Sequence, residues 1–440
     1  MVPGVDRPPG TRVIGRLLTL VVIGLLAAFF RRLGPLPVAA SATMLLGFLL
    51  LAGFVAGELA RELRLPRITG YLIIGIAFGP HTLGLFPADT VDFSLINEIA
   101  LSLIALQAGG ELRLQRLRSR LGTIGTITGL QIVSIILGVT TLVYVGSELF
   151  PFLRGLPDGK VLAAALVFGL VAVATSPAAT IAVITEMRAQ GAVADTVLGV
   201  CVVKDVAILL LIAIVMPSAA VLIEPARGFD FSQLGEIVLV IVLALIVGAL
   251  IGWLIILYLR RLNVQPVLFV LAVAFIVVEM AHMTGLESES YILMSMAAGF
   301  VVQNRSVQGP VFIEALEANS LPLYALFFAL AGAHLNLEVI PEVWRVGLLL
   351  IALRVTLLGA STNLAVRATG DLPSIRRHAW LGFLSQAGVT LGLATIVQAR
   401  LPDTGPAIAT VIIAMIAVHE LIGPPLFRAA LVRSGESGPA

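Results

Sequence analysis

The sequence predicts an all-α polytopic membrane protein that crosses the bilayer about 13 or 14 times. Of its 440 residues, 59% are hydrophobic and only 12% are charged, and the mean hydropathy is +1.05. A soluble domain carries roughly 25% charged residues. Apolar runs of membrane-spanning length follow one another along the chain, separated by Gly, Pro or charged loops, and no stretch between them is long enough for a soluble domain.

The candidate spans are apolar runs with boundaries uncertain by several residues. Their limits are 12–30, 37–59, 68–86, 94–110, 121–147, 160–184, 193–216, 234–259, 266–283, 290–303, 311–333, 343–366, 378–399 and 405–430. The first run has no convincing small-residue cleavage site and leads directly into the second. Residues 1–36 are therefore expected to form an additional N-terminal transmembrane helix, and residues 431–440 a short tail.

The basic residues predict the orientation of the chain in the membrane. If the N-terminus and every second loop are cytoplasmic, that side holds most of the arginines, including four in 113–120 and three in 61–67. Cytoplasmic loops are enriched in Lys and Arg, so both termini are expected in the cytoplasm. Arg31 and Arg32 fall on the opposite side and weaken the prediction for the first span only.

The seventh span has two adjacent charged residues near its centre, Lys204 and Asp205. Lys204 lies roughly 13 Å along a helix from Asp195, where the run begins, which is close to the bilayer midplane. An ionised group there costs about 2.5–3.5 kcal/mol on insertion scales. Lys204 is also one of only two lysines among the 28 basic residues. This placement indicates a chemical role.

Two other spans carry residues that break helices. Pro177, in Ala-Thr-Ser-Pro-Ala, interrupts the sixth span, and Ser-Gln-Ala-Gly, containing Gln386 and Gly388, occupies the corresponding place in the thirteenth. The two spans are seven apart, and an odd offset means opposite orientations in the membrane. Paired interruptions in oppositely oriented halves are typical of an inverted-repeat transporter with a binding site at the midplane.

Asp205 is the strongest candidate for the binding group. A membrane carboxylate can hold either a proton or a small cation, and this competition is a simple device for coupled exchange. The hydroxyls of Thr175 and Ser176, with the carbonyl oxygens of Val173 and Ala174, could complete an oxygen shell of the kind that hard cations prefer. The alternative is that Asp205 only pairs with Lys204 or Arg354 to hold two helices together.

The remaining polar residues of the spans are weaker candidates. Arg354 does not release its proton, so it is expected to be a fixed counter-charge, whereas a desolvated lysine such as Lys204 can lose its proton near neutral pH. Glu279, His419 and Glu420 lie nearer the ends of their spans, where a structural role is the more common explanation.

Other chemistries find no support in the sequence. The single cysteine, Cys201, lies within a span, which excludes a disulfide framework and a thiolate metal site. The sequence has no phosphate-binding Gly loop, metal-ligand spacing or hydrolase arrangement. We therefore expect no enzyme activity, no cofactor and no nucleic-acid partner.

Several motifs together resemble the monovalent cation/proton antiporter superfamily, especially bacterial sodium/proton exchangers and the membrane part of potassium-efflux antiporters. The likeness covers about residues 37–430. It rests on the following motifs: Leu65 to Leu72 with Gly79-Pro80, Gln107 to Leu112, Ala174 to Ala178, Leu198 to Asp205, Gly299 to Val301, Phe327 to Gly332, and Ile422 to Pro424.

The resemblance implies a homodimer with a dimerisation domain and a mobile core domain of crossed, broken helices. It also implies exchange of Na⁺ or K⁺ for H⁺ across a bacterial-type inner (plasma) membrane. By position, Asp205 would be the cation- and proton-binding carboxylate, and Arg354 would match the basic residue of the family's tenth core helix.

The sequence departs from this family at two positions. The family usually has Asp-Asp or Asn-Asp where this chain has Lys204-Asp205, and Val389 replaces the Glu of its second broken helix. With Lys204 and Arg354 charged, the local charge would be +1 and would repel a cation unless Lys204 is neutral or swings away. We therefore hypothesise that protonated Lys204 paired with Asp205 is the proton-loaded state. Channel-like, anion-conducting and non-transporting sensor derivatives of the same fold are the alternatives.

Overall fold

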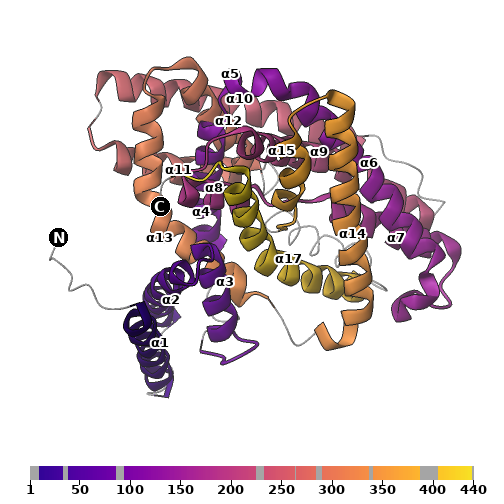
Figure 1. The fold of residues 1–440 in the computed structure, drawn as a ribbon, viewed down its shortest axis with the longest axis horizontal. Helices are drawn as coiled ribbons and strands as arrows, with labels where there is room; N and C mark the ends of the chain where they lie inside the picture. The colour runs from indigo at the N-terminus through magenta and orange to yellow at the C-terminus, as the bar shows by residue number, and fades with distance from the viewer. Residues whose placement is uncertain are drawn as a thin grey trace. The chain divides into compact units, whose positions relative to one another are not determined.

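The computed structural model describes residues 9–32, 38–85, 94–223, 232–262, 264–283, 290–335, 340–386 and 405–438, and all regular structure within them is helical (Figure 1). By contacts between residues, the chain divides into two compact units. The first unit contains residues 1–100 and 320–337, and the second contains residues 101–319 and 338–440.

Each predicted span contains a helix in its described residues. The helices are α1 (Pro9–Arg32), α2 (Val38–Glu62), α3 (Arg67–Phe78), α4 (Ser94–Glu111), α5 (Leu114–Leu117), η1 (Arg118–Arg120), α6 (Leu121–Val145), η2 (Ser147–Leu149), η3 (Pro151–Leu153), α7 (Asp158–Val173), α8 (Pro177–Met187), α9 (Ala192–Ile223), α10 (Ser232–Arg261), α11 (Pro266–Met283), α12 (Ser290–Arg305), α13 (Gly309–Ala333), α14 (Ile340–Thr369), α15 (Pro373–His378), η6 (Ala379–Phe383) and α17 (Gly405–Ser434).

The first unit is built around α2 and α3, with α1 and the end of α13 packed against them. Its core includes Ile23, Leu49, Phe78 and Ala329, one from each of these helices. At Gly75 a side chain would come within 2.1 Å of the Ala329 carbonyl oxygen. Only glycine allows α3 and α13 to pack this closely.

Polar contacts tie the first helix to the second. Arg16 of α1 forms ion pairs with Glu62 at 2.7 Å and with Glu58 at 3.4 Å. Glu58 also pairs with Arg61 at 2.8 Å and with Arg67 at the start of α3. The additional N-terminal helix is therefore an integrated part of the first unit.

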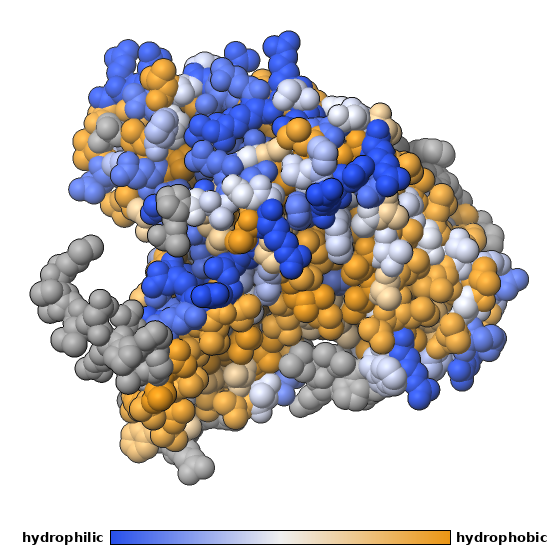
Figure 2. Space-filling model, in the orientation of Figure 1, coloured by the Kyte–Doolittle hydropathy of each residue, from blue (hydrophilic) through white to orange (hydrophobic). Residues whose placement is uncertain are grey.

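The second unit holds the helices that carry the candidate site. Nine helical segments in the described part of the chain are long and apolar enough to cross a membrane. Figure 2 shows hydrophobic residues over much of the visible face, with hydrophilic residues gathered along its upper part and again at its lower right edge. This pattern is the one expected of a protein embedded in lipid.

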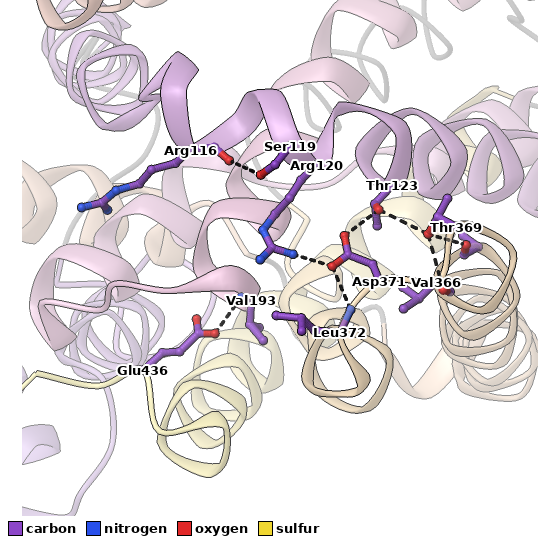
Figure 3. Close-up of polar contacts among 11 residues, drawn as sticks. Arg116, Ser119, Arg120, Thr123, Val193, Val366, Thr369, Asp371, Leu372 and Glu436 are labelled. Carbon is purple, nitrogen blue, oxygen red and sulfur yellow. Dashed lines mark hydrogen bonds and ion pairs between the residues drawn. The ribbon is translucent and has the colours of Figure 1, made fainter.

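Loops far apart in the sequence meet at one end of the second unit. Asn304, in the last turn of α12, contacts the backbone of Leu112 and Leu114. Arg120 pairs with Asp371 at 2.6 Å, and the C-terminal segment contacts the loop between α8 and α9 (Figure 3). The alternation of the predicted spans puts all of these loops on the same side of the membrane. Their contacts are consistent with that prediction.

Candidate functional site

The sixth predicted span is broken in its middle. Helix α7 ends at Val173 and α8 begins at Pro177, with Ala174 to Ser176 in non-helical conformation between them. Proline lacks an N–H and disfavours helical conformation in the residue before it. Ser176 then caps α8, because its hydroxyl oxygen accepts a hydrogen bond from the Ala179 amide at 3.1 Å. The predicted interruption is confirmed.

The thirteenth predicted span is irregular at the corresponding place. The short helix η6 ends at Phe383, and no regular structure follows through Gln386. Gly388 and the rest of this predicted span lie outside the described residues.

The two interruptions contact each other directly. The Ser176 amide donates a hydrogen bond to the Ser385 carbonyl oxygen at 2.9 Å. The Gln386 amide group donates to the Val171 carbonyl at 3.1 Å. Backbone groups freed from helical pairing are therefore satisfied across the crossing point, as burial at membrane depth requires.

Arg354 lies at this crossing, fully buried. Its guanidinium donates four hydrogen bonds of 2.8 to 3.1 Å to carbonyl oxygens at the ends of α7 and η6: Ala172, Ala174, Phe383 and Leu384. Carbonyl groups at a helix end carry partial negative charge and lack intrahelical partners. The positive charge of Arg354 therefore offsets the partial negative charge at the ends of both α7 and η6.

Asp205 lies on α9 and lines a cavity of about 40 Å³. The cavity is otherwise walled by Ser176, Pro177 and Ala178 at the start of α8, by Leu101, Ile104, Ala105 and Ala108 of α4, and by Ile292 and Met296 of α12. A water molecule needs about 10–15 Å³ by this measure, so the cavity has room for a small ion or a few waters. The N-terminal end of α8, which carries partial positive charge, forms part of this wall.

Lys204 leaves α9 in a different direction from its neighbour. Its side chain is fully buried, and Nζ lies 5.4 Å from the centre of the Phe383 ring. Nζ makes no hydrogen bond with any residue that the structure describes. An ammonium over an aromatic face is attracted by the ring quadrupole. In this conformation, Lys204 is therefore directed to the second interrupted segment.

The other predicted ligands are distributed around the crossing. Ser176 lines the cavity, whereas Thr175 and Val173 are buried but are not among its lining residues. The Ala174 carbonyl accepts its hydrogen bond from Arg354. Of the residues predicted to form the oxygen shell, the structure thus brings Ser176 to the cavity of Asp205.

The weaker candidates fall into two groups. Glu279 lies on the exposed side of α11. His419 and Glu420 are buried on α17, and their side-chain nitrogen and oxygen atoms make no hydrogen bond within the described chain. One turn later, a side chain at Gly423 would come within 2.2 Å of the Ser385 hydroxyl, so α17 packs tightly on the crossing.

The cavity walls from α4 and α12 were not predicted, because their lining residues are ordinary apolar side chains. Two glycines of the recognised motifs indicate why these helices meet. A side chain at Gly109 would lie 2.0 Å from the Met296 carbonyl oxygen, and one at Gly299 would lie 2.1 Å from that of Leu106. Ser102 and Ser295 also share a buried hydrogen bond of 2.8 Å. Small residues at such contacts let membrane helices approach closely.

A polytopic helical protein with two interrupted, mutually hydrogen-bonded segments beside a buried carboxylate has the architecture of a secondary transporter. Comparison with known proteins is more specific: the family of transmembrane sodium/hydrogen exchangers matches residues 46–429, and the chain belongs to this family.

Relatives agree with this assignment, and a solved structure matches the fold. The chain is 24% identical to the Na⁺/H⁺-K⁺ antiporter GerN of Bacillus cereus. The match covers 87% of this chain and 94% of GerN. The chain is 28% identical to a probable Na⁺/H⁺ antiporter, GerT, of the same organism, but spans only 42% of GerT's length. Its fold matches that of the sodium proton antiporter MjNhaP1 of Methanocaldococcus jannaschii with a TM-score of 0.72 and 19% identity, over 91% of this chain and 99% of that one.

Proposed function

We propose that this protein is a secondary antiporter that exchanges Na⁺ or K⁺ for H⁺ by alternating access, and that Asp205 is the shared site of the cation and the proton. The observation that carries the proposal is the cavity of about 40 Å³ that Asp205 lines together with Ser176. An ionised carboxylate and a hydroxyl are oxygen ligands of the kind that hard cations take. A protonated carboxyl group loses its attraction for the cation, so the two ions compete.

The surroundings of the two basic residues support cation transport over the alternatives. Four carbonyl oxygens accept hydrogen bonds from Arg354, so its charge offsets the ends of α7 and η6. The Lys204 ammonium faces the Phe383 ring. A Lys204 side chain directed to Phe383 supports the hypothesis that this lysine swings away from Asp205 before a cation binds. With both basic groups engaged in this way, less positive charge is available to attract an anion than the sequence suggested.

The setting of the proposed antiporter follows from the family and the charge distribution. We place it in a bacterial-type inner membrane as a homodimer, with both termini in the cytoplasm. The names of its relatives include both Na⁺/H⁺ and Na⁺/H⁺-K⁺ antiporters, so Na⁺ and K⁺ are both candidate substrates.

The test is dye-reported proton flux in proteoliposomes after addition of Na⁺, K⁺ or Li⁺, for the wild type and for Asp205→Asn. We expect cation-specific flux in the wild type and a loss of at least about a hundredfold in the variant, because the amide cannot carry the charge that both ions need. Flux that follows chloride instead would indicate the anion-conducting derivative. No flux with any ion would indicate the sensor.

A further inference from the structure

The last residues of the described chain fold back onto the loop between α8 and α9. The Glu436 carboxylate accepts hydrogen bonds from the backbone amides of Val193 at 2.8 Å and Ala194 at 2.9 Å. Figure 3 shows Glu436 beside Val193 at the start of α9. The Gln190 amide donates to the Glu436 carbonyl at 3.0 Å, and the Gly438 amide donates to the Met187 carbonyl at 2.9 Å.

This arrangement is a helix cap supplied from a distant part of the chain. The first amides of α9, which begins at Ala192, have no carbonyl partner within the helix. Caps are usually supplied by a Ser, Thr, Asp or Asn just before the helix, but this position is Gly191. A side chain at Gly191 would come within 2.3 Å of the Glu436 carboxyl carbon. The sequence therefore has no local cap where Glu436 provides one.

The C-terminal segment contacts two of the four helices that wall the cavity, α8 and α9. Helix α8 carries Ser176 and Pro177 at its start and ends at Met187, which the C-terminal segment holds. Helix α9 runs without interruption from Ala192 past Asp205, which lies roughly 18 Å from the capped amides. The same segment therefore holds the end of α8 and the start of α9, two of the cavity walls.

We propose that Glu436 is a positioning residue for cation binding: by holding the start of α9 to the C-terminal segment, which also binds the end of α8, it sets the spacing between Ser176 and Asp205. This inference rests on the proposed role of Asp205. The charged groups near Glu436 belong to the same end of the unit. Asp195 lies one turn into α9, and Arg113, Arg116 and Arg120 act electrostatically on it together with Glu436.

The experiment compares Glu436→Ala, Glu436→Gln and Glu436→Asp in proteoliposomes, measuring the cation concentration for half-maximal flux and the maximal rate separately. For Glu436→Ala we expect the half-maximal concentration to rise by about fivefold, the size of one lost helix cap, with a smaller change in maximal rate. Glu436→Gln keeps one acceptor oxygen and should recover part of the loss. Arg433→Gln, which changes a charge in the same segment without touching the cap, is the matched control.

A second measurement follows the cap itself without transport. Hydrogen exchange of the peptide covering 190–198 should be faster in Glu436→Ala than in Arg433→Gln. Faster exchange with an unchanged half-maximal concentration would reduce Glu436 to a structural cap and overturn the inference. Unchanged exchange would also overturn it. If the wild type shows no cation-driven flux, the proposed function is overturned as well. If the wild type shows flux and the Glu436 variants show the same half-maximal concentration, only the role of Glu436 is overturned.

Discussion

At the scale of single residues, Arg354 and Lys204 are both fully buried, but their surroundings assign them different tasks. Arg354 has five donors in a rigid fork and donates four hydrogen bonds to carbonyl oxygens of the two interrupted segments. Lys204 has a flexible stem and an aromatic neighbour, with no hydrogen bond to the described residues. The hydrogen bonds of Arg354 suit it to a structural role, whereas Lys204, without such bonds, is suited to move.

We predict that Lys204→Met changes the coupling of exchange rather than abolishing the site. Methionine keeps a similar volume but removes the ammonium that would repel a cation near Asp205. The half-maximal cation concentration should fall by several-fold, and the dependence of exchange on pH should flatten. Proton flux measured over a range of pH checks this outcome. Lys160→Met, which alters the other lysine of the chain, should behave as the wild type; unchanged pH-coupled exchange in Lys204→Met would remove this lysine from the mechanism.

At the scale of elements, apolar runs and helix-breaking residues predicted most of the framework. Pro177 located the break between α7 and α8 because proline acts locally on backbone geometry. The contacts of Arg354 could not be predicted, because its carbonyl partners lie 180 or more residues earlier and about 30 residues later in the chain. The cap from Glu436 is equally non-local; the only sequence signal for it is a glycine where α9 lacks a capping side chain.

The packing of α17 on the crossing leads to a prediction for Gly423. A methyl group there would lie 2.2 Å from the Ser385 hydroxyl and 2.8 Å from its amide nitrogen. Gly423→Ala must therefore displace Ser385, whose carbonyl binds the Ser176 amide. We expect a loss of about 1–3 kcal/mol in stability, as for other overpacked sites, and a large loss of exchange. Thermal unfolding in detergent and flux assays measure both. Gly347→Ala on α14, which has open space around it, should be neutral.

A polar contact at the end of α14 predicts how stability depends on pH. Burial opposes ionisation of Asp371, but hydrogen bonds from Thr123, the Leu372 amide and Arg120 outweigh it and hold the pKa of this carboxyl below its usual value (Figure 3). A group whose pKa is lowered on folding stabilises the protein above its unfolded pKa, about 3.9 for Asp, and loses this contribution as the pH falls further.

Asp371→Asn should therefore melt at a lower temperature than the wild type at neutral pH, and the difference should shrink below about pH 4. Melting curves recorded in detergent across this range check the prediction. Glu148→Gln, at an exposed carboxylate, is the control. A difference that persists unchanged into acid would mean that the charge of Asp371 does not stabilise the fold.

At the scale of the whole molecule, charge alternation along the sequence and contacts within the second unit lead to the same topology. Each loop contact at the end shown in Figure 3 joins segments an even number of predicted spans apart. Contacts alone place these segments together but do not assign a compartment; the arginines predict the cytoplasm, because positive loops are enriched there. The two arguments are independent, so one labelling experiment tests both.

Helix α6 offers the clearest pair of positions for that experiment. It is a single helix of 25 residues, roughly 37 Å long, so we expect its two ends to face opposite sides of the membrane. The only native cysteine, Cys201, is buried and can be replaced by serine to give a background without reactive thiols. In that background, Ser119→Cys should react with an impermeant thiol reagent only after the cells are permeabilised. Glu148→Cys should react in intact cells. The reverse pattern would invert the orientation, and labelling of both from one side would show that α6 does not span the membrane.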